Sequence, residues 1–181
     1  MAGCSNNSKS TSLNAGSSEA TPTTSAHMAG PPVEIHVTPE TIAAKPKPWV
    51  LTTPQSAVRS YLDWTSYAYR IATSDAATPT MGPDEGVRVD SYVQYNAEKK
   101  QIIDQTLSSI TFGKPSVGTT STLVPTKESW SYRYVSIEDP SKVVGGPYTA
   151  SYDSTYTLVK SKKGGVWQVY KVDAQPQGTV K

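Results

Sequence analysis

The sequence predicts an α+β domain in which N-terminal helices pack on one face of a curved antiparallel sheet, preceded by a disordered tether. Three observations predict it. Every Trp, Tyr and Phe lies between Trp49 and Tyr170, and the first 48 residues contain none. Apolar residues recur at helical spacing early in this region, and at alternate positions later in it. Helices followed by a run of strands are typical of α+β folds.

The composition divides the chain into a tether at residues 1–48, a folded domain at residues 49–175 and a short tail at residues 176–181. Residues 5–25 are mostly Ser, Thr, Asn, Gly and Ala. Such a segment buries too little apolar surface to offset its ordering entropy, so we expect it to be disordered. Residues 31–48 are richer in Pro and should be more extended. Within them Val33, Ile35 and Val37 alternate with polar residues, as a short edge strand or as linker.

Two helices are predicted at the start of the domain. Thr53 suits a helix cap and Pro54 the first helical position. The helix ends near residues 73–75, and a second helix begins around Pro83 with Asp84 and Glu85, whose charges suit a helix N-terminus better than a metal site. It fades near residues 96–100. The apolar stripe of the first helix contains Val58, Tyr61, Leu62, Trp64, Thr65, Tyr67, Ala68, Tyr69, Ile71 and Ala72.

After the helices the period changes to two. Residues 102–112 are predicted to form a strand, and residues 119–137 a longer one with Pro125 at a bend or an edge position. Residues 139–140 and 145–147 bound a loop. Residues 148–160 and 166–174 then form a hairpin around a tight turn at residues 163–165. Along the second strand Trp130, Tyr132 and Tyr134 share one face.

Cys4, the chain's only cysteine, follows Ala2-Gly3 as in the cleavage region of a bacterial lipoprotein signal. There the cysteine is lipidated, which would anchor the protein to the membrane on its extracytoplasmic side. A free thiol is a liability in an oxidising compartment, and acylation would remove it. The alternative is a chance Ala-Gly-Cys in a disordered tail.

Several classes of function lack support in the composition. A net charge of +2 favours neither nucleic acid nor an acidic membrane surface. The only histidines, His27 and His36, fall in the predicted tether, so no nucleophilic triad is expected in the domain. No metal site is expected either, since only carboxylates remain as ligands. There is no Gly-rich phosphate loop, and we expect no cofactor.

Three features together resemble the NTF2-like superfamily, in which a strongly curved sheet forms a cone around N-terminal helices. They are the first-helix segment Tyr61-Leu62-Asp63-Trp64, the strand around Glu128 and Trp130, and the closing hairpin at residues 156–169. With the tether, the chain resembles exported lipoproteins of actinobacterial type that carry an NTF2-like domain. The strand and the hairpin also resemble the intermembrane-space domains of chloroplast-division proteins, which bind other proteins. The superfamily includes enzymes, carriers and interaction modules, so the resemblance alone implies no single function.

The aromatic residues form the main candidate site, because eleven tyrosines and four tryptophans exceed what a minimal core needs. If the strands pair in register, their aromatic side chains form one cluster. That face is either the inner wall of the cone, with a pocket at its mouth, or an interaction surface. The candidate pocket or interface residues are Asp63, Trp64, Tyr67, Trp130, Tyr132, Tyr134, Tyr152 and Tyr156.

Three functions remain open. The first is a lipid-anchored extracytoplasmic module that binds an envelope protein or a small ligand without catalysis. The second is an isomerase or dehydratase in which a buried Asp63 is the base and a tyrosine is the hydrogen-bond donor. In the alternative without a catalytic role, Asp63 faces solvent or pairs with Arg59 or Tyr67. The third is an accessory subunit of a cell-envelope complex, with the tether raising its local concentration.

Overall fold

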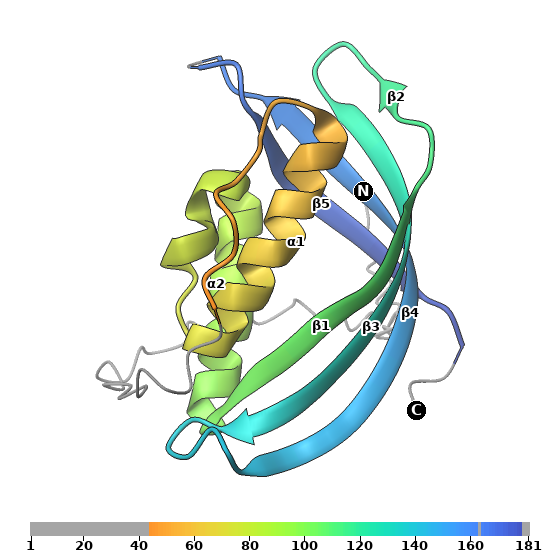
Figure 1. Cartoon of the computed structure of the whole chain (residues 1–181). Coiled ribbons are helices and arrows are strands. Elements are labelled where there is room, and N and C mark those ends of the chain that lie inside the picture. The colour runs from red at the N-terminus through yellow and green to blue at the C-terminus, as the bar shows by residue number, and fades with distance from the viewer. Residues whose placement is uncertain (1–43, 163, 179–181) are drawn as a thin grey trace, which may run out of the picture. The chain divides into compact units, whose positions relative to one another are not determined.

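The computed structural model describes residues 44–162 and 164–178. Within them, helices lie on one side of a five-stranded antiparallel sheet (Figure 1), which confirms the α+β class. Cys4, both histidines, residues 33–37 and Lys163 lie outside the described residues. The elements are α1 (Pro54–Ile71), the 3-10 helix η2 (Asp75–Thr80), α2 (Pro83–Glu98), β1 (Gln101–Phe112), β2 (Ser116–Val117), β3 (Thr122–Ser136), β4 (Val143–Lys160) and β5 (Trp167–Pro176).

Helix α1 begins where its capping signals predict. The Thr53 hydroxyl accepts a hydrogen bond from the Ser56 amide at 3.2 Å, and the Ser56 hydroxyl accepts one from the Thr53 amide at 3.1 Å. This reciprocal pair satisfies two backbone donors that a helix start leaves free. The helix ends at Ala72, which takes the left-handed conformation with φ of 53°. The 3-10 helix η2, which follows, was not anticipated from the sequence.

The strand order in the sheet is β1-β3-β4-β5, and β2 pairs with β3 beyond the end of β1. The last pair between β1 and β3 joins Phe112 to Thr126. Pro125 therefore lies just past that ladder, where its missing N–H costs no strand hydrogen bond. Its carbonyl oxygen still accepts a hydrogen bond from the Gly113 amide at 2.8 Å. The sequence prediction of a special position for Pro125 agrees with this placement.

The sheet is less curved than predicted. Its strands bend over the helices, yet the sheet stays open and is not strongly curled, with β1 and β5 as its two edges (Figure 1). The predicted strongly curved cone is therefore wrong in degree. Bending arises at discrete register shifts, one in β1 after Leu107, two between β3 and β4 on either side of Tyr134, and one between β4 and β5 at Thr157. Local bulges of this kind bend a strand without closing the sheet.

Strand β4 begins earlier than predicted. Residues 145–147 were expected in a loop, but Gly145 pairs with Tyr134 and Val143 pairs with Val135. The register shifts on both sides of Tyr134 absorb the additional residues. Gly146 takes a φ of +96°, which glycine reaches without strain. Pairing with β3 thus continues through a segment whose composition alone is typical of a turn.

The main core lies between α1 and the helix-facing side of β3, β4 and β5. Its fully buried side chains include Ala57 and Val58 from α1 and Val124, Leu158 and Val169 from the strands. A second, smaller cluster of Ile102, Val135 and Ile137 packs against Ala72 and Ala97 at the far end. No helix among residues 44–162 and 164–178 is long and apolar enough to span a membrane.

Candidate functional site

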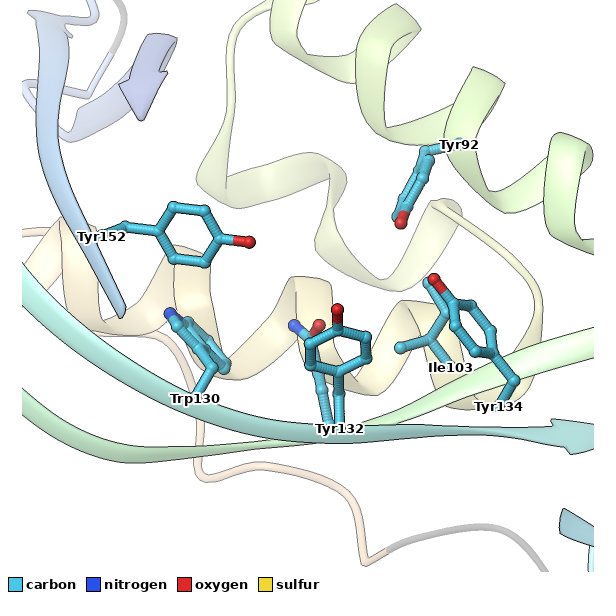
Figure 2. Close-up of a pocket in the computed structure, with 7 residues that line it drawn as sticks. Tyr92, Ile103, Trp130, Tyr132, Tyr134 and Tyr152 are labelled. Carbon is cyan, nitrogen blue, oxygen red and sulfur yellow. The ribbon is translucent and has the colours of Figure 1, made fainter. Parts of the chain in front are cut away.

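An aromatic pocket lies between α2 and the helix-facing side of the sheet (Figure 2). It has a volume of about 150 Å³. Tyr92 reaches into it from α2, and the other aromatic side chains rise from β3 and β4. The structure therefore brings together four of the residues selected from the sequence and adds three others. The lining consists of Tyr92, Ile103, Gln105, Trp130, Tyr132, Tyr134 and Tyr152.

The alternation of β3 builds most of this pocket. Trp130, Tyr132 and Tyr134 stand two residues apart, so their side chains point to the same face of the sheet. The rings of Tyr132 and Tyr134 meet edge to face, with centroids 6.0 Å apart. On the neighbouring strand β4, the ring of Tyr148 packs against that of Tyr132, with centroids 5.3 Å apart. The three side chains of β3 are half-buried, so they belong neither to a closed core nor to a fully exposed interface.

Tyr92 and Tyr132 of the pocket stay protonated well above neutral pH. Burial raises the pKa of Tyr92, and a hydrogen bond with Tyr134 raises it further. Burial also raises the pKa of Tyr132, with added repulsion from Tyr134, Tyr152 and Tyr148. Their hydroxyls are therefore neutral groups that can donate or accept hydrogen bonds.

Tyr156, predicted for the same cluster, lies instead in the core. Its ring packs edge to face against Tyr61 of α1, with centroids 6.0 Å apart. Its hydroxyl donates a hydrogen bond to Glu128 Oε1 at 2.7 Å. Burial and the neighbouring Glu128 carboxylate raise the pKa of Tyr156 far above its usual value.

Glu128 is a buried carboxylate next to the pocket, with 5% of its surface exposed. Besides the Tyr156 hydroxyl, it accepts hydrogen bonds from Thr126 Oγ1 at 2.6 Å and from Trp130 Nε1 at 3.0 Å. All three donors are neutral groups. A buried carboxylate needs such donors, because unpaired burial is costly.

A second buried carboxylate, Glu85, lies at the start of α2. It accepts hydrogen bonds from the Tyr61 hydroxyl and from the Arg88 guanidinium, whose Nε lies 3.0 Å from Glu85 Oε2. The hydrogen bond to Glu85 raises the pKa of Arg88. Burial raises the pKa of Tyr61. The sequence interpretation of Glu85 as a helix-start charge is thus incomplete, because its side chain also joins the two helices.

Asp63 lies outside the pocket. Its carboxylate pairs with Arg59 one turn earlier on α1, with Oδ1 3.1 Å from Nε, and 40% of the side chain is exposed. The helical pairing with Arg59 was the structural alternative weighed from the sequence. A base of the predicted isomerase type would need a buried carboxylate among tyrosines, and Asp63 does not meet that requirement.

Trp64 and Tyr67 also lie away from the pocket. Trp64 is 3% exposed and packs edge to face on Trp49 and Tyr67, at 5.2 and 5.9 Å. Its indole N–H donates to the Lys47 carbonyl oxygen at 3.1 Å. These contacts attach the segment before α1 to the helix, so we assign both aromatic residues to packing.

Sequence reasoning missed Tyr92 and Glu128 as site residues. Glu128 has the same strand parity as Trp130 and Tyr132, which was a usable signal, since parity alone places it on the helix-facing side. Tyr92 lies on α2, and nothing in the local sequence indicated that its side chain meets those of β3. Gln105 and Ile103 line the pocket because β1 pairs with β3, and this long-range pairing was also not evident from the local sequence.

The lining of the pocket is aromatic and carries hydroxyl and amide groups. Among the described residues, no His, Cys, Asp, Glu, Lys or Arg lines it. Glu128 is not part of the lining, but it accepts a hydrogen bond from the indole of Trp130, which is. Within residues 44–162 and 164–178 no three side chains of metal-ligating type gather to form a metal site.

Comparison with solved structures shows which proteins have a similar fold. The structure is similar to that of the intermembrane-space region of the chloroplast protein ARC6, with a TM-score of 0.53 and 15% sequence identity. The match covers 68% of this chain and 94% of that region. No protein-family model matches the sequence, and no curated protein matches it. At this identity the similarity establishes a shared fold and nothing more about function.

Proposed function

We propose that this chain is a membrane-tethered protein-interaction module that works on the extracytoplasmic side of a membrane. The observation that carries the proposal is the open aromatic pocket, whose lining offers contact area and neutral hydroxyls but no acid–base pair. Tyr and Trp are enriched at protein interfaces for these reasons. Trp130, Tyr132, Tyr134 and Tyr152 are its proposed contact residues.

The surroundings of the pocket support an interface. Tyr92 at its edge and Tyr95 one turn later on α2 are 41% and 51% exposed. Val143 and Val144, at 45% and 49%, begin the strand that pairs with β3 beside Tyr134. Exposed apolar side chains such as these are available for contact with a partner.

The similarity in fold to ARC6 is consistent with the proposed location. Its matching region lies in an intermembrane space, as its name states. The sequence also resembles intermembrane-space domains of chloroplast-division proteins, which bind other proteins. With Cys4 as a lipid-attachment site, this domain would lie outside the cytoplasmic membrane and act as a subunit of an envelope complex.

The proposal is tested by photo-crosslinking in cells. A photoreactive phenylalanine analogue replaces Tyr92 at the pocket or, as the matched control, Thr149 on the opposite face of the sheet. We expect a discrete membrane-fraction adduct from position 92 and none from position 149, and the Cys4→Ser variant should move the protein into the soluble fraction. Equal adducts from both positions would contradict an interface at the pocket. If the unmodified protein and the Cys4→Ser variant partition equally into the membrane fraction, the proposed lipid anchor is wrong.

A further inference from the structure

The pocket collects oxygen atoms without a matching positive charge. The hydroxyl groups of Tyr92, Tyr132, Tyr134 and Tyr152 converge in it, one from above and the others from the sheet (Figure 2). No lysine or arginine of the described residues lines it. Phenolic oxygens accept hydrogen bonds, and ring faces attract cations. An anion would find no positive charge in this lining.

A buried carboxylate adds negative potential beside the pocket. Glu128 is joined to the pocket wall through Trp130 Nε1 at 3.0 Å and lies directly across the strand pair from Tyr152. Its three hydrogen-bond donors are a hydroxyl, a phenol and an indole. In the part of the chain that the structure describes, no cation forms an ion pair with it. Because charges interact strongly in a poorly polarisable interior, a nearby cation would gain from this carboxylate.

The dimensions restrict the ligand. A cavity of about 150 Å³ accommodates a group about as large as benzene. A short alkyl chain that ends in an ammonium group fits this volume, with its methylene groups against the rings and its N–H donors toward the oxygens. Tyr132 and Tyr92 are neutral phenols near neutral pH, and a neutral phenol oxygen still accepts hydrogen bonds.

We propose that the aromatic pocket binds an alkylammonium group, presented either by a lysine side chain of a partner protein or by a free organic amine. Four phenolic oxygens and the flanking Trp130 ring form the cage, and Glu128 supplies the charge that selects a cation. The inference rests on the proposed function in taking the pocket as the binding surface, and it names the chemistry that the surface recognises.

The test is a titration of the full chain with n-butylammonium, n-butanol and butyrate, followed by NMR at the Trp130 indole N–H. The Trp130→Phe variant assigns that resonance. We expect saturable shifts with n-butylammonium at about millimolar Kd, at least about tenfold weaker binding of the neutral alcohol, and no shift with butyrate. Equal binding of alcohol and amine, or no saturation with the amine, would overturn the proposal.

Variants separate the charge from the pocket. Glu128→Gln should weaken n-butylammonium binding by about tenfold and leave n-butanol binding unchanged. Asp153→Asn is the matched control, because that carboxylate lies near Lys127 in the adjacent strand and outside the pocket. If Glu128→Gln fails to fold, Tyr132→Phe removes a single hydroxyl and should still weaken amine binding. Unchanged amine affinity in Tyr132→Phe would count against the cage.

A last titration distinguishes the two sources of the cation. Binding of Nα-acetyl-lysine amide with the affinity of n-butylammonium assigns the pocket to a partner's lysine side chain. Exclusion of this derivative, with n-butylammonium still bound, assigns it to a free amine. These titrations contain no protein partner. A negative result therefore contradicts the cation site alone, and the proposed interaction module is still tested separately by crosslinking.

Discussion

Glu128 and Asp63 are two acidic residues within two positions of a tryptophan in the sequence, and they have opposite environments. Glu128 is carried inside by the alternation of β3, where neutral donors satisfy it. Asp63 is carried outside by the rotation of α1 and pairs with Arg59. Adjacency to Trp or Tyr in sequence is therefore a weak sign of burial. The angular position of the residue on its element decides the environment.

Trp64 is expected to contribute strongly to stability. Trp64→Ala should lower the free energy of unfolding by about 3 to 5 kcal/mol, because it removes a buried ring that packs on Trp49 and Tyr67. Chemical denaturation measures this loss. Asp63→Asn is the neighbouring control and should cost less than about 1 kcal/mol, since its ion pair is exposed. Similar losses in both variants would show that Asp63 has a structural role beyond its pairing with Arg59.

At the scale of elements, the start of β4 shows how pairing overrides composition. Residues 145–147 have the residues of a turn, yet β3 holds them in the sheet. An added Cβ at Gly146 would lie 3.1 Å from Arg133 Cα and from Tyr148 Cδ2. The segment therefore depends on glycine for its conformation and for space.

Gly146→Ala is expected to destabilise the domain by about 1 to 3 kcal/mol, because the variant combines backbone strain with crowding. Gly164 has the same φ of +96° in the turn after β4 but meets no atom within 4 Å. Gly164→Ala is therefore the matched control for backbone strain alone and should cost less. Thermal or urea denaturation of both variants measures the difference. If both variants lose the same free energy of unfolding, β3 moves at Arg133 to accommodate the added Cβ without measurable cost.

At the scale of the whole molecule, buried tyrosines couple folding to pH. Burial raises the pKa of Tyr69 to about 12, raises that of Tyr61 well above its usual value, and raises that of Tyr156 beyond that of Tyr69. An unfolded chain loses the same protons near pH 10. Above that pH the unfolded state binds fewer protons than the folded state, so stability is fully present below about pH 10 and falls as the pH rises toward the folded values.

We therefore expect alkaline unfolding. The free energy of unfolding should fall above about pH 10 by up to roughly 1.4 kcal/mol per pH unit for each tyrosine that the fold keeps protonated. Urea denaturation from about pH 9 to about pH 11.5 measures the slope. Tyr156→Phe should make the fall in the free energy of unfolding per pH unit smaller by the contribution of one tyrosine. This variant also lowers stability at neutral pH. A free energy of unfolding that does not change across this range would contradict the burial of these phenols.

The elements and much of the pocket were accessible from the sequence. Thr53 and Pro54 marked the start of α1, Pro83 marked α2, and the period of two in residues 128–134 placed Trp130, Tyr132 and Tyr134 on one face. These signals are local, because caps and side-chain alternation depend on residues within a few positions of one another. The hypothesis that they form one cluster needed only antiparallel pairing in register.

What the tertiary structure alone decided is which elements meet. The bend of the sheet, the extension of β4 through residues 145–147, the coverage of the pocket by Tyr92 and the burial of Glu128 and Glu85 against Tyr156 and Tyr61 all follow from long-range pairing. Tyr156 shares its strand face with Tyr152, yet one is core and the other lines the pocket, because the helices cover only part of that face. Local sequence sets the face on which a side chain lies, and packing of distant segments sets what covers it.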